Sequence, residues 1–229
     1  MRTARPAAPQ YATSQTGYYP IIVSVFCAML LISNVAATKA IDIGPLTFDG
    51  GGLLFPLTYI LGDVLSEIYG LKKTRMAIIL GFVLGVVASI CFLIVGLLPP
   101  AAGWTFQSDF ENILGFVPGV VVASLCGYLA GQFLNAYVLV KMKERAQERQ
   151  LWARLVGSTV VGELADTFIF CALACTIGPI PPALFWNYFL TGYVFKCAVE
   201  IVLLPVTYRV IAAIKRHEPS YQTEAVQTA

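Results

Sequence analysis

Residues 76–98 read MAIILGFVLGVVASICFLIVGLL and contain no charged side chain. About twenty apolar residues in a helix, each rising about 1.5 Å, cross the roughly 30 Å hydrocarbon core of a bilayer. This stretch therefore predicts a membrane-spanning helix. The whole chain of 229 residues shares its character, since 58% of the residues are hydrophobic and only 12% are charged. Soluble domains carry about 25% charged residues, so we predict an integral membrane protein.

The rest of the chain, read on the same scale, predicts an all-α, polytopic membrane protein with six transmembrane helices. The predicted spans cover residues 19–39, 52–70, 76–98, 113–140, 155–177 and 184–208. The second span is the weakest, because Pro56 interrupts it and the glycines at 50–52 precede it. Short membrane segments interrupted by glycine or proline are typical of transporter binding sites.

Lysine and arginine residues predict the orientation of these spans. Thirteen of the fifteen lie before the first span, between spans two and three, between spans four and five, or after span six. The opposite connections carry the acidic residues Asp42, Asp49, Asp109 and Glu111. Because cytoplasmic loops are enriched in Lys and Arg, both termini are predicted to be cytoplasmic. We expect residues 1–18 and 216–229 to be disordered cytoplasmic segments that flank a transmembrane domain at 19–215.

The sequence holds no signature of an enzyme or of a cofactor site. His217 is its one histidine, and it has neither a Walker motif nor a glycine-rich dinucleotide loop after a strand. The cysteines lie in apolar stretches and are predicted to be buried hydrophobic residues rather than disulfide partners or metal ligands; they are Cys27, Cys91, Cys126, Cys171, Cys175 and Cys197. We therefore predict no catalysis, no cofactor, no metal and no nucleic-acid partner.

Five ionisable residues lie well inside the predicted spans, away from the span ends, namely Asp63, Glu163, Asp166, Lys196 and Glu200. An ionised side chain at mid-bilayer costs at least about 2.5–3.5 kcal/mol, so it normally faces a partner or a water-filled cavity. Four acids against one lysine leave a formal charge of −3. Ion pairs and interhelical hydrogen bonds explain one or two such residues, but the excess of acids favours a solute cavity.

The depth of these residues supports one common site. Four polar residues on four predicted helices lie about 10–12 Å from the cytoplasmic boundary, namely Asp63, Gln132, Glu163 and Glu200. Asp166 and Lys196 fall one layer nearer the bilayer midplane. We expect the first four to line one cavity, with Asp166 and Lys196 at its boundary as a pair that breaks and reforms during transport.

Further residues in the same spans suit a flat, polar solute. Asn34 and Asn135 extend the predicted substrate-binding set, and the aromatic stacking candidates are Phe55, Tyr59, Tyr128 and Tyr193. Glu67 follows Asp63 at the i,i+4 spacing, which places both on one helix face. We therefore group Glu67 with Asp166 and Lys196 as candidates for coupling or gating.

Five motifs stand out in chain order. They are SNVAATK at 33–39, FPLTYILGDVLSEIYG at 55–70, GQFLN at 131–135, GS followed by GELADT between 157 and 167, and YVFK followed by PVTY between 193 and 208. This ordered set resembles the queuosine-precursor transporter family, also known as putative vitamin uptake transporters, over about residues 19–215. The resemblance implies a six-helix bacterial inner-membrane importer of 7-deazaguanine bases, such as 7-cyano-7-deazaguanine or its aminomethyl relative, for tRNA modification.

The chemistry of such a solute agrees with the candidate residues. A guanine-like edge presents two adjacent N–H donors and a carbonyl acceptor, so a carboxylate can accept both donors while an amide or a lysine donates to the carbonyl. Asp63 and Glu163 are the preferred edge readers, with Gln132 and Asn135 as their amide partners. Aromatic faces can hold the flat bicycle.

Two other functions stay open on the sequence. One is a substrate-binding subunit of an energy-coupling-factor-type vitamin importer, whose partner helix could seat on the small residues Ala36 and Ala40. The other is a structural or assembly membrane protein whose buried charges fix helix pairing. The preferred 7-deazaguanine, the coupling ion and a homo-oligomeric state also stay open.

The sequence also predicts two three-helix halves, about residues 19–98 and 113–212. An odd number of spans in each half gives the halves opposite orientations. The middle helix of each half carries a similar signature, GDVLSE at 62–67 and GELAD at 162–166. Inverted repeats with a binding site at their interface are a recurrent plan among transporters.

Overall fold

The computed structural model describes residues 11–12, 17–36, 39–43, 46–114, 118–146, 150–177 and 182–221. Its elements are α1 (Tyr19–Ala36), β1 (Ala40–Ile43), β2 (Leu46–Asp49), η1 (Gly50–Leu53), α2 (Phe55–Leu97), α3 (Gln107–Leu114), α4 (Pro118–Ala146), α5 (Leu151–Ile177), η2 (Pro182–Leu184) and α6 (Phe185–His217). Five of these helices, α1, α2, α4, α5 and α6, are long and apolar enough to cross a membrane. The predicted helical, multi-pass membrane fold is confirmed at this level.

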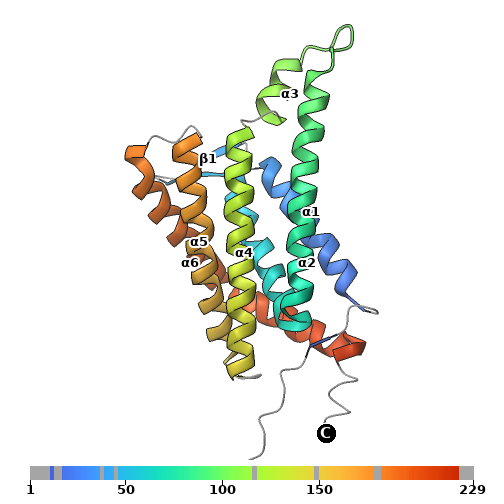
Figure 1. Ribbon diagram of the computed structural model, residues 1–229, viewed down its shortest axis with the longest axis vertical. Coiled ribbons are helices and arrows are strands. Elements are labelled where there is room, and N and C mark those ends of the chain that lie inside the picture. The colour runs from blue at the N-terminus through green and yellow to red at the C-terminus, as the bar shows by residue number, and fades with distance from the viewer. Residues whose placement is uncertain are drawn as a thin grey trace, which may run out of the picture.

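Helix α2 contains both of the predicted spans 52–70 and 76–98. At Gly70 its backbone has φ 76° and ψ 173°, a conformation that is essentially restricted to glycine. Figure 1 shows α2 descending in cyan as far as this break and rising again in green. We call residues 55–69 the first arm and residues 71–97 the second arm. The predicted loop between the two spans is wrong, because residues 71–75 already belong to the helix.

The structure corrects other predicted boundaries as well. Pro56 lies in the first turn of α2, where a missing N–H is tolerated, so it does not interrupt a span. The predicted fourth span began at residue 113, but α3 occupies residues 107–114 and α4 begins at Pro118. Residues 40–43 and 46–49 pair as the antiparallel strands β1 and β2, which the all-α prediction did not include.

The long helices lie side by side in one bundle. Helix α4 packs most extensively against α5, and α2 packs against both α1 and α4. Figure 1 shows α4 descending, α5 rising and α6 descending again, with the last part of α6 turning beneath α2. Pro205 lies within α6 and removes one helical hydrogen bond there. The change in direction of α6 brings the last part of this helix to the lower end of the bundle.

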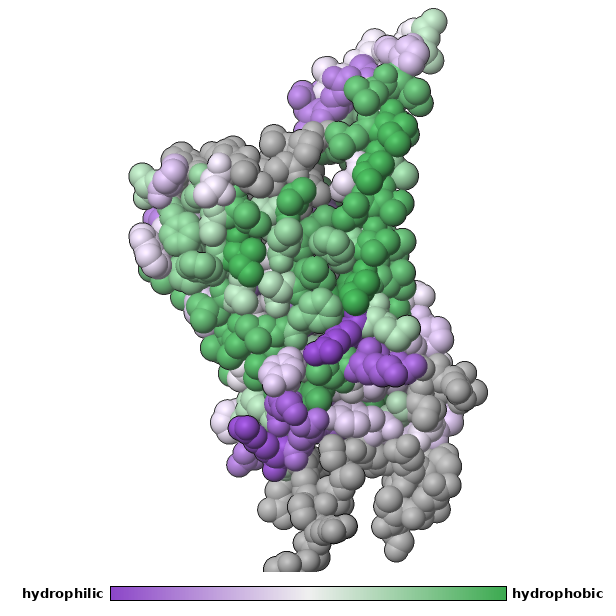
Figure 2. All heavy atoms as spheres, viewed as in Figure 1, coloured by the Kyte–Doolittle hydropathy of each residue, from purple (hydrophilic) through white to green (hydrophobic). Residues whose placement is uncertain are grey.

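The outer surface and the interior differ as a membrane protein requires. Figure 2 shows a broad hydrophobic face over the long helices, with hydrophilic residues gathered at the two ends of the molecule. Large apolar side chains such as Val83, Val87 and Ile94 of the second arm are about half exposed. Phe26, Leu30 and Leu65 are fully buried between α1 and α2. The exposed apolar belt fits contact with lipid.

The first and last described residues of the chain contact the lower end of the bundle. The Ala12 amide donates to Ile68 O over 2.7 Å. The buried Glu218 carboxylate accepts from the Tyr18 amide over 2.9 Å and from Tyr69 Oη over 2.8 Å. These bonds join the start of α1, the end of the first arm and the end of α6 around the break at Gly70.

The break at Gly70 leads to a prediction about stability. Gly70 has a φ that residues with a side chain rarely adopt, and a Cβ atom at this position would lie 3.2 Å from the Tyr11 ring. We expect Gly70→Ala to lower the free energy of unfolding by about 1–3 kcal/mol. Thermal unfolding of the purified protein in detergent measures this change. Gly96→Ala is the matched control, since its nearest neighbour is 3.8 Å away, and an equal loss of stability in both variants would contradict the prediction.

Candidate functional site

Four carboxyl groups from three helices gather inside the bundle. Asp63 lies on the first arm of α2, Glu163 and Asp166 lie on α5, and Glu200 lies on α6. Their exposed fractions are 0%, 1%, 3% and 5%, respectively. Burial of this kind removes hydration from each carboxylate, so each needs a hydrogen-bond donor, a cation or a proton.

Lys196 is the cation of this cluster. Its Nζ donates to Asp166 Oδ2 over 2.7 Å and lies 3.3 Å from Glu163 Oε2. One lysine on α6 thus binds two carboxylates that are three residues apart on α5. Residues at this spacing lie on the same face of a helix. The expected contact between Asp166 and Lys196 is therefore present as an ion pair in this conformation.

Neutral donors hold the other two carboxyl groups. Asn135 of α4 donates through Nδ2 to Asp63 Oδ1 over 2.7 Å. Thr159 of α5 donates through Oγ1 to Glu200 Oε1 over 2.8 Å. The Asp63 and Glu200 carboxyl groups also lie within reach of each other. Thr159 was not among the predicted residues, although it lies four residues before Glu163, one helical turn away on the same face.

Several polar atoms beside these carboxyl groups have no hydrogen-bond partner among the described residues. They are Tyr59 Oη, both amide atoms of Gln132, Asn135 Oδ1 and Thr167 Oγ1, all on buried side chains. A buried polar group without a partner costs about 1–3 kcal/mol. These groups therefore offer unused donors and acceptors, which a polar solute could satisfy.

The site is closed around its own side chains. The pocket that reaches Glu200 and Thr159 has a volume of about 10 Å³. Small-molecule sites usually measure about 300–1,000 Å³. Binding a bicyclic base here would therefore require α5 and α6, which line this pocket, to separate.

Close contact between α4 and α5 determines how tightly the site packs. Gly127 and Gly131 of α4 face α5, and a Cβ at Gly131 would lie 2.6 Å from Asp166 Cβ and 2.9 Å from Gly162 O. A Cβ at Gly162 would in turn lie 2.7 Å from Asn135 Cβ. The spacing Gly127-x-x-x-Gly131 is the small-residue motif of packed membrane helices, a signal that the sequence analysis did not use.

The remaining predicted residues occupy different places. Tyr59 and Tyr128 are fully buried and pack edge to face with ring centroids 6.4 Å apart. The Tyr193 ring stacks on Phe189, and its hydroxyl donates to Val160 O over 3.3 Å. Asn34 lies beside Gly85 of the second arm, and no hydrogen bond among the described residues joins it to the acidic cluster. The Phe55 side chain lies outside the described part of the chain.

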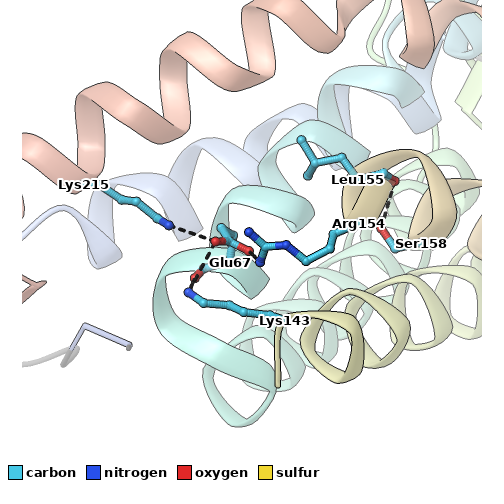
Figure 3. A network of polar contacts seen from close by, with 6 residues as sticks. All are labelled: Glu67, Lys143, Arg154, Leu155, Ser158 and Lys215. Atoms are coloured by element: carbon cyan, nitrogen blue, oxygen red, sulfur yellow. Dashed lines mark hydrogen bonds and ion pairs between the residues drawn. The ribbon is translucent and has the colours of Figure 1, made fainter. Parts of the chain in front are cut away.

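Glu67 lies in a second network, one helical turn below Asp63. Lys143 of α4, Arg154 of α5 and Lys215 of α6 all form ion pairs with its carboxylate. The Lys215 contact measures 2.8 Å, and Lys143 also donates to Glu67 O over 2.5 Å. Figure 3 shows the three basic side chains converging on Glu67 from three different helices. Glu67, Lys143 and Arg154 are buried, so one carboxylate ties four helices together at this end.

The fold and these two charged clusters define a multi-pass membrane protein with a polar interior. A family model described as "Putative vitamin uptake transporter" matches residues 49–210. The chain belongs to this vitamin uptake transporter family. The expected family resemblance is confirmed.

Curated relatives carry a more specific name. The chain is 33% identical over 191 residues to a "Probable queuosine precursor transporter" of Bacillus subtilis, which covers 82% of each protein. It is 25% identical over 223 residues to the "Queuosine precursor transporter" of Escherichia coli, covering 94% of this chain and 98% of that one. A "Probable queuosine precursor transporter" of Haemophilus influenzae is 26% identical over 163 residues. The match covers 70% of this chain and 67% of that protein. No solved structure matches the chain.

The glycine contacts give a prediction about the site. Gly131→Ala would place a methyl group against the Asp166 side chain and the Gly162 carbonyl. We expect it to lower stability by about 1–3 kcal/mol through overpacking and to reduce transport by displacing Asp166. Thermal unfolding and uptake measure the two effects.

Gly192→Ala is the control for this substitution, because the nearest atom to its Cβ is at 3.6 Å, an ordinary contact. We expect its stability and uptake to stay near those of the unchanged protein. Normal stability and transport in Gly131→Ala would show that the α4–α5 contact does not position the site.

Proposed function

We propose that this protein is an inner-membrane importer of queuosine precursors, 7-deazaguanine bases such as 7-cyano-7-deazaguanine, which supply tRNA modification. The names of the relatives point to this class of solute. The observation that carries the proposal is the group of buried carboxyl and amide side chains with unused hydrogen-bonding atoms. This chemistry matches the edge of a guanine-like base, which presents adjacent N–H donors beside a carbonyl.

We assign recognition of the base to Asp63 together with Gln132 and Asn135. Asp63 Oδ2 has no donor among the described residues, and the Gln132 amide is likewise unpaired. Asp63 would accept the N–H groups of the base, and an amide would donate to its carbonyl. Tyr59 and Tyr128 would lie beside the flat ring. Glu163 is a less favourable reader in this conformation, because Lys196 already binds it.

We propose six membrane crossings with both termini cytoplasmic. The two arms of α2 run in opposite directions from Gly70, as Figure 1 shows, so that α2 supplies two crossings. The basic residues of the Glu67 network and both described chain ends lie at the same end of the bundle (Figures 1 and 3). The positive-inside rule assigns that end to the cytoplasm. Residues 19–98 and 113–212 would then form the two inverted halves.

We propose that the Glu67 network is the cytoplasmic gate. Its ion pairs join α2, α4, α5 and α6 below the acidic cluster, so they must break before a solute can leave toward the cytoplasm. Alternating access would exchange this closed cytoplasmic end for one that closes on the side of α3, near Asp109 and Glu111. Asp166 and Lys196 would rearrange within the same movement.

The central prediction concerns uptake and its dependence on Asp63. Cells that lack their own transporter and cannot make queuosine precursors should take up radiolabelled 7-cyano-7-deazaguanine when they express this chain. Asp63→Asn should weaken the apparent affinity for the solute by about tenfold to a hundredfold, because the new amide presents a donor toward the donors of the base. This range corresponds to the loss of a hydrogen bond to a charged group, which contributes about 1.5–3 kcal/mol. Titration of the uptake rate with solute measures this change.

Asp109→Asn on the exposed helix α3 is the matched control, since it neutralises a carboxylate away from the site. Uptake by the purified protein alone in liposomes separates the proposal from a binding subunit that needs an energy-coupling module. Unchanged affinity in Asp63→Asn would move the recognition role to Glu163 or Glu200. No uptake in cells and none in liposomes would contradict the proposed function itself.

The gate gives a separate prediction. Glu67→Gln would leave three basic side chains without their shared counter-charge, which typically costs about 3–5 kcal/mol in a buried site, and it should therefore open the cytoplasmic end. A single cysteine placed at the buried Ser158 in a cysteine-free background should then react with a polar thiol reagent at least about tenfold faster, the ratio that about 1.4 kcal/mol produces. Glu144→Gln is the control, because its ion pair with Lys141 is exposed. Equal labelling rates in folded Glu67→Gln and Glu144→Gln would exclude Glu67 from the gate.

A further inference from the structure

The contact between Asp63 and Glu200 is unusual because two acids meet without a cation. Each carboxyl group uses one oxygen to accept from a neutral donor, Asn135 for Asp63 and Thr159 for Glu200. The second oxygens, Asp63 Oδ2 and Glu200 Oε2, are buried and have no donor among the described residues. Neither carboxyl group forms an ion pair with a described residue. The two carboxyl groups nevertheless lie within hydrogen-bonding reach of each other.

Two ionised carboxylates cannot hold this geometry. Both would be acceptors with no hydrogen between them, and two like charges in a shared buried site strongly disfavour double ionisation. A single proton removes both problems, since a protonated oxygen of one acid can donate to the free oxygen of the other. The contact therefore has the chemistry of a carboxyl–carboxylate pair.

The groups around the pair do not supply an alternative counter-charge. From α5, Glu163 faces Glu200 and adds negative charge. From α2, Glu67 lies one turn below Asp63, and on α6 Cys197 lies near Glu200. Lys196 is held by Asp166 and Glu163 at 2.7 and 3.3 Å. A proton is thus the species that this arrangement accommodates with the least movement.

We infer that Asp63 and Glu200 share one proton and that this proton is the ion that moves with the solute, an inference that rests on the transport function proposed above. The proton would bind while the site is open toward α3, and it would hold the first arm of α2 against α6. Release of the proton toward the cytoplasm would leave two carboxylates in contact. Their repulsion would separate α2 from α6 and favour release of the base that Asp63 binds.

The test uses the purified full-length protein in proteoliposomes, at zero membrane potential, with radiolabelled 7-cyano-7-deazaguanine. A gradient of one pH unit, alkaline inside, should drive accumulation toward about tenfold, which is the limit for one proton per solute. A sodium gradient of the same size should drive none. In Glu200→Gln the internal concentration should not rise above the external one, whereas Glu144→Gln, whose ion pair with Lys141 is exposed, should accumulate solute as the unchanged protein does.

A second measurement does not depend on transport. Infrared spectra of the unchanged protein at neutral pH should contain a carbonyl band of a protonated carboxyl group that shifts in D₂O and is missing from Glu200→Gln. Absence of this band from the unchanged protein would overturn the shared proton, whatever the liposomes do. Solute transport that ignores the pH gradient or follows sodium would overturn proton coupling and leave the proposed importer in place. If neither solute nor protons move but the band is present, the proton pair stands and the importer function fails.

Discussion

The burial of four carboxyl groups against one lysine is the constraint on which the rest of this structure depends. Lys196 binds Asp166 and Glu163, and it leaves Asp63 and Glu200 to neutral donors. An interior of this kind would be costly in a protein that served only to pack helices, because interhelical polar contacts contribute on average only about 0.6 kcal/mol each. The cost is understandable where the same groups must bind a solute and then release it.

The distribution of charge along the bundle links this cluster to the network below it. The acidic cluster carries an excess of negative charge, whereas Glu67 is surrounded by Lys143, Arg154 and Lys215. Asp63 and Glu67 belong to the same arm of α2, and four residues correspond to about 6 Å along a helix. Any displacement of this arm changes both networks together. The first arm is therefore the element through which the proposed solute site and the proposed gate would be coupled.

The sequence was sufficient for the class of fold and for most of the charged residues, because an apolar span and a buried acid are properties of single helices. The i,i+3 spacing placed Glu163 with Asp166 on one face of α5. The direct contact between Asp63 and Glu200 could not be predicted, since it depends on how α2 packs against α6. Thr159 was missed because a threonine in a membrane helix usually bonds its own backbone. The break in α2 at Gly70 could not be predicted either, because it was recognised only from the positive φ of this residue.

The length of the first arm explains where the site can open. Its residues 55–69 extend about 22 Å as a helix, less than the roughly 30 Å of a bilayer core. In the proposed arrangement of six crossings, η1, β1 and β2 would therefore continue this crossing without regular helix. Irregular backbone is tolerated at membrane depth where protein covers it or where it lines a water-filled cavity. Ser33 of α1 provides part of that cover by donating to Gly51 O over 3.3 Å. A segment held by such contacts is easier to move than a helix with a complete set of backbone hydrogen bonds. Under the proposed function, the solute would therefore enter on the side of β1 and β2, opposite the Glu67 network.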